Sequence, residues 1–290
     1  MAVGSPPIDW DLVSDGTKVS RGPGATAKFK VRAVSYLNTV PLVWGMLHGP
    51  QRDKVELSFS LPSDCARDVE NGAAEVGLVP VAEIARQGLT IIPGVGITCL
   101  GAVRSILLFT RVPWRQIRTL AADASSRTSV ELARVMLRER FGVEPRITRH
   151  KPELRDMLSQ ADAALVIGDP ALRIEPKTTG WEWLDLGAEW FRLTGLPFVF
   201  AAWAGKPGIE VNELVGLTVE SHLFGQAHIE VIVEQEFGRR GVSRETAHRY
   251  LTEHIRFAVG GEEQRGLAAF LELAHLSTNQ GQPVFAGKEL

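Results

Sequence analysis

Apolar and polar positions in the first part of the chain alternate between the period of strands and the period of helices. Short runs rich in β-branched residues predict strands at 29–35, 55–60 and 75–79. Each run leads into a segment of helical periodicity, and these segments lie at 41–47, 62–71 and 80–87. Because parallel strands need a crossover connection between them, this βαβαβ order predicts a parallel sheet.

A second region repeats the alternation from about 110 to 201. It follows two β-rich segments at 96–103 and 105–111. Its strands are expected at 118–122, 146–149, 163–167 and 183–186, and its helices at 128–141, 152–160 and 188–194. The helix over 128–141 has a broad apolar face, as expected for a helix that packs on a sheet. The segment 198–203 is apolar at every position and therefore predicts a buried parallel strand.

From Val211 onward the periodicity is helical, at 211–237, 243–255 and 262–276, with no strand pattern after Trp203. The three short helices predicted in the first region do not suffice to cover its sheet, so we expect these C-terminal helices to pack on it. The prediction is an α/β protein of two lobes. Its parts are a flexible tail at 1–27, a discontinuous first lobe at 28–109 and 202–290, and a second lobe at 110–201.

Two chain connections would join these lobes, near Phe109 to Arg111 and near Ala201 to Trp203. Lobes connected in this way form a hinge that closes over a cleft. Ligand pockets favour such interfaces between domains. We therefore expect a small molecule to bind between the lobes.

Charge and composition exclude several classes of partner. With a net charge of −2, the chain lacks the excess positive charge that is typical of proteins that bind nucleic acid or an anionic membrane. The short basic run Arg239-Arg240 is interpreted as a solvated face. The two cysteines, Cys65 and Cys99, predict reduced thiols and a cytoplasmic protein. We expect no secretory signal and no membrane span, and either a monomer or a homodimer.

Polar side chains cluster where predicted strands end, which is where ligands bind in open α/β sheets. Ser35, Tyr36 and Asn38 follow the first strand. Asn38 either caps the next helix or points its amide at a ligand. Ser63 begins the second helix, either as a plain cap or as part of a site whose helix-start amides face the cleft.

The segment 125–129 opens the helix at 128–141 with more hydroxyl groups than a single cap requires. Hydroxyls and an arginine at a helix start form an anion-binding arrangement. The candidate ligand-binding residues there are Ser125, Ser126, Arg127, Thr128 and Ser129.

Further candidates follow three other strands or helices. Ser105, at a strand junction, either lines the cleft or bonds to the backbone. Gly168 permits close backbone approach, and Asp169 is either a helix cap or an acceptor for a ligand hydroxyl. Thr194 ends a helix within reach of the expected cleft.

Several common sites have no sequence signature here. The chain has no phosphate-binding glycine loop, no dinucleotide fingerprint, and no zinc-protease or serine-hydrolase motif. Its histidines are scattered and none pairs with a cysteine or carboxylate at ligand spacing. We therefore expect neither a metal nor an organic cofactor.

Six segments taken in order resemble the chorismate dehydratase family: VSYLNTVPL, LPS, VGLVP, SRTS, LVIGD and TGLPFVFAAW. The resemblance covers roughly residues 30–205. It implies a fold like that of type 2 periplasmic binding proteins. It also implies a lyase that dehydrates chorismate to 3-[(1-carboxyvinyl)oxy]benzoate in the futalosine pathway of menaquinone biosynthesis.

The resemblance places two catalytic residues by motif match, Asn38 and Ser105. It also makes Ser125, Ser126, Thr128 and Ser129 substrate-binding groups. Since the sequence offers no evident side-chain base, we hypothesise that a carboxylate of the substrate takes the proton. Two alternatives remain: a cytosolic small-anion-binding protein of the same fold, and the related 1,4-dihydroxy-6-naphthoate synthase.

Overall fold

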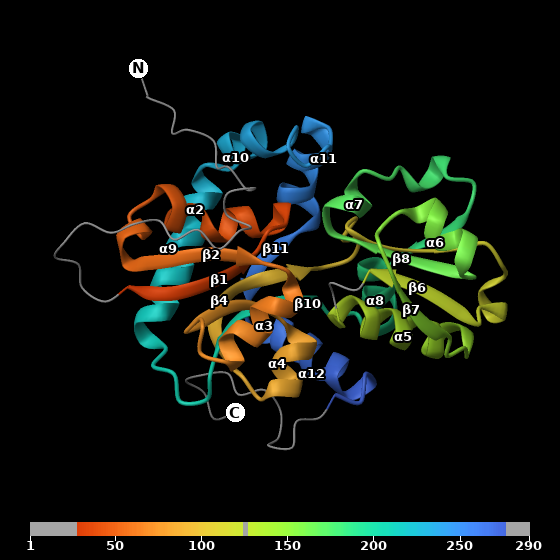
Figure 1. The fold of residues 1–290 in the computed structure, drawn as a ribbon, viewed down its shortest axis with the longest axis horizontal. Coiled ribbons are helices and arrows are strands. Elements are labelled where there is room, and N and C mark those ends of the chain that lie inside the picture. The colour runs from red at the N-terminus through yellow and green to blue at the C-terminus, as the bar shows by residue number, and fades with distance from the viewer. Residues whose placement is uncertain (1–27, 124–126, 277–290) are drawn as a thin grey trace.

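The chain forms two lobes that lie side by side, each built around its own mixed β-sheet (Figure 1). This computed structural model describes residues 28–123 and 127–276, without the side chain of Ser63. The six-stranded sheet has the order β11-β4-β10-β3-β1-β2, and the five-stranded sheet the order β7-β6-β8-β5-β9. Two lobes are therefore present, as the alternating pattern predicted.

The six-stranded sheet contains both parallel and antiparallel strands. Its members are β1 (Phe29–Val34), β2 (Val55–Ser60), β3 (Val76–Pro80), β4 (Thr90–Cys99), β10 (Phe198–Gly205) and β11 (Arg256–Val259). The first three are parallel to one another, which confirms that prediction. The prediction that the apolar run at 198–203 is a parallel strand is wrong, because β10 runs antiparallel to both β3 and β4. All of β10 is buried, and burial on both faces does not encode the direction of a strand.

The five-stranded sheet contains β5 (Ile106–Thr110), β6 (Thr119–Asp123), β7 (Arg146–His150), β8 (Ala163–Ile167) and β9 (Glu182–Asp185). Strand β5 pairs along its whole length with β8 and lies antiparallel to it. The chain therefore passes between the sheets at 100–105 and again at 195–197. Both crossings come several residues before the expected ones, because the β-rich sequence around them does not indicate which sheet each residue joins. The lobe limits at 109/110 and 201/202 stay a prediction.

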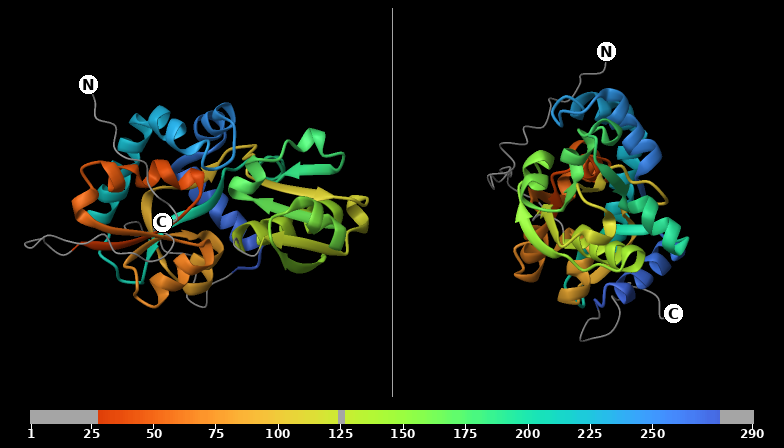
Figure 2. Two further views of the ribbon diagram at one scale, coloured as in Figure 1. Left: turned by 45° about the horizontal axis from the view of Figure 1, so that its top comes forward. Right: turned by 90° about the vertical axis from the view of Figure 1, so that its right-hand side faces the viewer.

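The C-terminal helices pack on the first lobe, as expected. Helix α9 (Asn212–Ala227) lies against α2 (Val40–His48) and β4, and α12 (Gly261–Leu273) lies against β10. Figure 2 shows these helices around the larger lobe from two further directions. The remaining helices are α3 (Pro62–Glu70), α4 (Val81–Gln87), α5 (Arg127–Phe141), α6 (Leu154–Gln160), α7 (Gly168–Leu172), α8 (Leu186–Thr194), α10 (Ile229–Glu236) and α11 (Arg244–Arg249).

Two C-terminal predictions need correction. The expected helix at 211–237 breaks at His228, which separates α9 from α10. The expected helix at 243–255 begins as predicted, with the Ser243 hydroxyl accepting the Thr246 N–H, but continues as a π-helical turn at Tyr250–His254. Strand β11 follows that turn and pairs with β4. Its four residues, two of them exposed, are too few to show a strand pattern.

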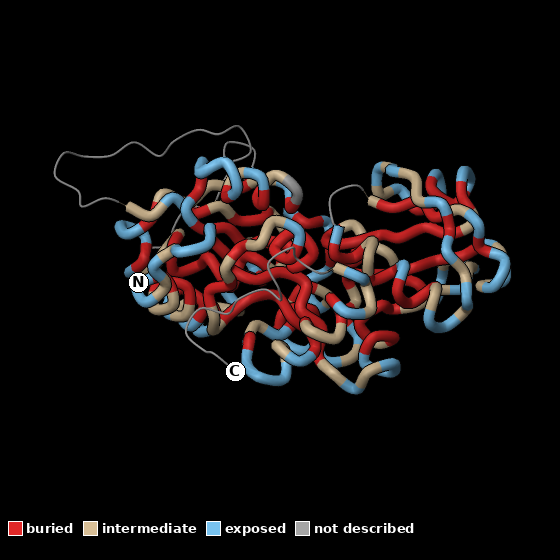
Figure 3. The backbone as a smooth tube through the Cα atoms, turned by 90° about the horizontal axis from the view of Figure 1, so that it is seen from below, coloured by how far each residue is buried: buried red, intermediate tan, exposed pale blue. Residues whose placement is uncertain are grey.

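Buried backbone runs through the middle of both lobes, and exposed backbone lies at their edges (Figure 3). The largest core cluster includes residues of both sheets and of the C-terminal helices. The two lobes therefore share packed interior rather than meeting only through two linkers.

We expect Gly225→Ala to destabilise the protein by about 1–3 kcal/mol. Helix α9 crosses α2 so closely here that a Cβ on Gly225 would lie 2.1 Å from the carbonyl oxygen of Pro41. Gly216→Ala on the same helix is the matched control, because a Cβ there meets nothing within 4 Å. That control should gain about 0.5–1 kcal/mol from helix propensity. Urea unfolding of both variants measures the contrast, and equal effects would contradict the close crossing.

Candidate functional site

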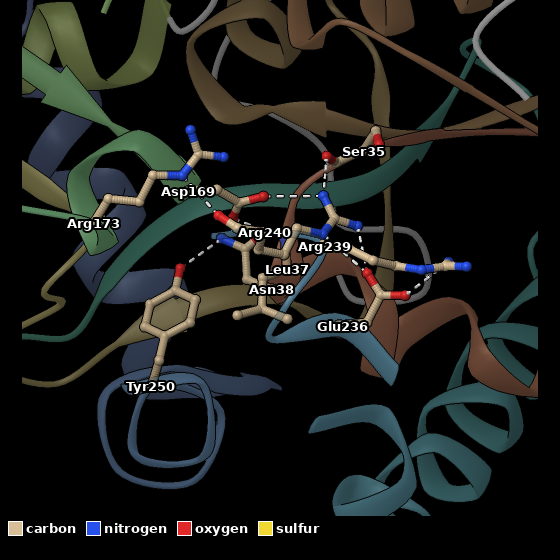
Figure 4. A network of polar contacts seen from close by, with 9 residues as sticks. All are labelled: Ser35, Leu37, Asn38, Asp169, Arg173, Glu236, Arg239, Arg240 and Tyr250. Atoms are coloured by element: carbon tan, nitrogen blue, oxygen red, sulfur yellow. Dashed lines mark hydrogen bonds and ion pairs between the residues drawn. The ribbon is translucent and has the colours of Figure 1, made fainter. Parts of the chain in front are cut away.

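The candidate site lies where four segments distant in sequence meet between the lobes. They are the turn after β1, the crossing at 100–105, the turn after β8, and the C-terminal segment around α11. Figure 4 shows side chains from three of these segments pointing toward one another. Several predicted site residues therefore come together.

Asn38 and Ser105, the two predicted catalytic residues, are joined through the phenol of Tyr250. Asn38 Nδ2 donates to Tyr250 Oη at 3.0 Å, and Tyr250 Oη donates to Ser105 Oγ at 2.9 Å. Asn38 lies in the 3-10 turn Leu37–Thr39, and no side chain caps that turn or the start of α2. Its Oδ1 is buried and has no hydrogen-bond partner among the described residues.

The crossing that carries Ser105 is held rigidly. Asp185 accepts the backbone N–H groups of Val103 at 3.0 Å and of Arg104 at 2.6 Å. Arg104 has a φ of 68°, in the left-handed region that a non-glycine residue rarely adopts. Its guanidinium donates to the carbonyls of Ala171 and Ile174. These contacts fix the backbone immediately before Ser105.

Asp169 connects the second lobe to the first through a buried ion pair. Its Oδ1 accepts the Leu37 N–H at 3.1 Å, and its Oδ2 lies 2.9 Å from Arg240 Nη1. Arg240 also donates to the Ser35 carbonyl and pairs with Glu236, both contacts lying within Figure 4. Burial raises the pKa of the Asp169 carboxyl, while the Arg240 guanidinium opposes that rise.

Gly168 lets the second lobe approach the first closely. Its φ is +64°, and a Cβ built on it would lie 3.0 Å from the ring of Tyr36. The Gly168 N–H donates to the Ser105 carbonyl at 2.8 Å. Ser35, Tyr36, Gly168 and Asp169 therefore belong to the same cluster as Asn38 and Ser105.

The other predicted residues have more varied placements. Thr128 is buried and its hydroxyl accepts the Ala82 N–H of α4 at 3.1 Å, which links the lobes a second time. Ser129 is also buried. Arg127 is exposed and pairs with Glu83 at 3.1 Å. Ser125, Ser126 and the Ser63 side chain lie outside what the structure describes.

Thr194 uses its hydroxyl at the end of its own helix. Its Oγ1 donates to the Trp190 carbonyl at 2.9 Å and accepts the Leu196 N–H at 3.1 Å. The hydroxyl thus terminates α8, and no contact places it with Asn38 or Ser105.

Sequence reasoning missed Tyr250, Arg240 and Glu236. The interpretation of Arg239-Arg240 as a solvated face is wrong for Arg240, which is 7% exposed. An acidic residue that follows an apolar strand, such as Asp169, is expected to be buried and to need a cationic partner. The sequence pattern does not identify which arginine or lysine supplies it. Burial raises the pKa of the Tyr250 phenol above its ordinary value, so this group is protonated at neutral pH.

The described residues form neither a cluster of metal ligands nor a membrane-spanning helix. Within 28–123 and 127–276, no three His, Cys, Asp or Glu side chains are grouped so that they could hold a metal ion. Over those ranges, too, every helix is too short or too polar to cross a bilayer. Cys65 and Cys99 are buried free thiols whose pKa values are raised by burial.

Comparison with known proteins identifies relatives over almost the whole described region. The profile of a family described as "Menaquinone biosynthesis" matches residues 29–276. A chorismate dehydratase of Thermus thermophilus is 29% identical over 257 residues, which cover 82% of this chain and 92% of that protein. A chorismate dehydratase of Campylobacter jejuni is 23% identical, with 82% and 94% covered.

Solved structures confirm the predicted fold class. The periplasmic aliphatic sulphonate binding protein SsuA of Escherichia coli superposes with a TM-score of 0.60, covering 92% of this chain and 96% of that one at 14% identity. The two mixed sheets thus match those of periplasmic binding proteins. At this identity the likeness concerns the fold alone.

Proposed function

This chain belongs to the menaquinone biosynthesis family, and from that premise we propose that it is a lyase that dehydrates chorismate. The product would be 3-[(1-carboxyvinyl)oxy]benzoate. The chorismate dehydratase relatives in two bacteria support this assignment. The observation that carries it is the pairing of Asn38 and Ser105 on one buried phenol between the lobes.

The reaction breaks one ring C–H bond and the neighbouring C–OH bond, and the ring becomes aromatic. The departing hydroxide needs a hydrogen-bond donor because it is a poor leaving group. In our proposal Ser105 supplies that donor, and Asn38 accepts from the same hydroxyl while it is bound. An oriented hydrogen-bond donor to a departing oxygen is typically worth a factor of about 10²–10³.

Binding of one substrate carboxylate falls to other groups in this proposal. The start of the 15-residue helix α5, with Thr128 and Ser129, offers N–H groups to one carboxylate. The segment 125–126 before it is assigned to the same carboxylate by family resemblance. The substrate would lie in a cleft between the lobes, in the cytoplasm, without a metal or cofactor.

A carboxylate of the substrate would take the ring proton, and the departing hydroxide would receive that proton and leave as water, which restores the carboxylate. The side chains considered as bases are each engaged elsewhere. Glu83 pairs with Arg86 and Arg127, Asp169 pairs with Arg240, and His150 Nε2 bonds to Thr148. An internal carboxylate is already attached to the substrate, so the donors of the site only have to orient it toward the ring hydrogen.

Incubating the purified protein with chorismate and analysing the products by mass spectrometry tests this function. We expect loss of one water and formation of the carboxyvinyloxy benzoate. Binding of chorismate without that product would contradict the proposal and favour a small-anion-binding protein. Turnover of only the cyclic futalosine-derived substrate would identify a naphthoate synthase instead.

The same assay tests the internal base. His150→Gln and Glu83→Gln should retain turnover, because neither side chain takes the proton in our account. If either variant binds chorismate but no longer converts it, that side chain is the base and the internal-base mechanism fails.

A further inference from the structure

We propose that Tyr250 is a positioning residue that sets the hydrogen-bond polarity of the site. It makes Asn38 present an acceptor and Ser105 present a donor to one ligand hydroxyl. The catalytic consequence rests on the proposed dehydratase function, whereas the polarity itself does not. Neither the family profile nor the motif resemblance assigns a role to this residue.

The polarity follows from counting donors and acceptors. A neutral amide has donors only on nitrogen and acceptors only on oxygen, and a phenol can donate once. Asn38 Nδ2 donates to Tyr250 Oη, so the phenol oxygen is an acceptor there and its own proton goes to Ser105 Oγ. Ser105 accepts from Tyr250, which leaves its hydroxyl proton for another partner.

The same arrangement fixes where Asn38 directs its oxygen. Because Nδ2 is held by Tyr250, Oδ1 must point away from the phenol. That oxygen is buried and no described group bonds to it. Buried acceptors are normally satisfied, so a buried Oδ1 without a partner among the described residues points to a ligand donor.

Tyr250 is well placed to impose this geometry. It is 1% exposed and begins the π-helical turn Tyr250–His254, a form that recurs at functional sites. His254 ends the turn, and its Nδ1 lies 3.2 Å from the carbonyl oxygen of Ala102, in the crossing at 100–105. Burial also keeps the phenol protonated by raising its pKa. The donor to Ser105 therefore persists across the neutral pH range.

In this proposal one ligand group satisfies both ends of the hydrogen-bonded series Asn38–Tyr250–Ser105. A hydroxyl can donate to Asn38 Oδ1 and accept from Ser105 at the same time. An ether or a ketone at that position cannot donate, and it would leave the buried Oδ1 unpaired. The polarity therefore selects a ligand with a free ring hydroxyl, the group that leaves as water in the proposed reaction.

Neutron diffraction from crystals of the deuterium-exchanged wild-type protein tests the polarity without any variant or turnover. We expect the Tyr250 deuteron to lie toward Ser105 Oγ and a deuteron on Asn38 Nδ2 to lie toward Tyr250 Oη. A deuteron on Ser105 that points to Tyr250 Oη would overturn the inference. This result stands whether or not chorismate is the substrate.

Kinetics of Tyr250→Phe test the consequence for catalysis. The ring remains and only the hydroxyl is lost, so kcat should fall on the order of 10²-fold while KM changes little. In a Ser105→Ala background the same change should cost less, because the part of the Tyr250 effect that acts through Ser105 is already lost there and only the part through Asn38 remains. Full additivity, or an unchanged kcat in Tyr250→Phe, would contradict the positioning role.

Thr218→Val is the matched control for loss of a buried hydroxyl. Thr218 is 1% exposed, and within the described part of the chain its hydroxyl bonds inside α9, at 3.0 Å to the Leu214 carbonyl. Its loss should leave kcat and KM unchanged. A wild-type protein without chorismate turnover would refute the proposed function, and the neutron result would then still decide the polarity.

Discussion

Asn38→Ala should lower kcat for chorismate dehydration by about 10²-fold, because this amide orients the reacting hydroxyl and misplacement of a reacting group costs about that much. The variant removes the buried Oδ1 that accepts from the departing hydroxyl and the amide that donates to Tyr250. The Asn38 side chain has no hydrogen-bond partner other than Tyr250 among the described residues, so the fold should persist. Steady-state kinetics with chorismate, together with an unfolding curve, separates loss of activity from loss of structure.

Asn71→Ala serves as the control for this variant. Asn71 is exposed at the end of α3 and lies outside the site cluster. Its replacement should leave the kinetics unchanged. Full activity in Asn38→Ala would exclude a catalytic contact between this amide and the substrate.

Arg240→Leu should lower the free energy of unfolding by about 3–5 kcal/mol, because it removes one partner of a buried ion pair. Asp169 and Glu236 would remain buried beside an apolar side chain, at 6% and 1% exposure. The contact between Asp169 and the first lobe would then rest on the Leu37 N–H alone. Urea unfolding at neutral pH measures the loss.

The stability loss in Arg240→Leu should also depend on pH. Burial already raises the pKa of Asp169 in the folded protein, and loss of Arg240 raises it further. A folded state that holds the proton more tightly gains stability as pH falls through that raised pKa. The deficit of Arg240→Leu should therefore shrink toward acid pH.

Arg249→Gln is the control for Arg240→Leu, because it removes one partner of an exposed ion pair instead of a buried one. Arg249 and Glu253 lie 3.2 Å apart on the surface, and such pairs contribute at most about 1 kcal/mol. A loss in Arg240→Leu as small as that in Arg249→Gln would show that the ion pair at Asp169 does not hold the lobes together.

The sequence predicts those parts of the fold that depend on local periodicity. The parallel strands β1, β2 and β3 and the long helix α5 follow directly from it. Strand direction in β10 does not, because a central strand is apolar on both faces whichever way it runs. Likewise, β11 is recognisable only from its pairing with β4.

The site residues also fall into those that local sequence reasoning finds and those that it misses. Asn38 and Asp169 follow strands, a position where ligand groups gather, so local reasoning finds them. Tyr250 and Arg240 come from C-terminal segments that reach the site only by tertiary packing. A phenol inside a helical stretch and an arginine in a basic pair resemble ordinary core and surface residues. Their partners, Ser105 and Asp169, are 145 and 71 residues away.

A crystal structure of Ser105→Ala soaked with chorismate tests the central claim most directly. The variant should bind the substrate without converting it at an appreciable rate. We predict that the ring hydroxyl of chorismate lies within hydrogen-bond distance of Asn38 Oδ1, between the two lobes. Chorismate bound elsewhere, or with that hydroxyl turned away from Asn38, would contradict the account.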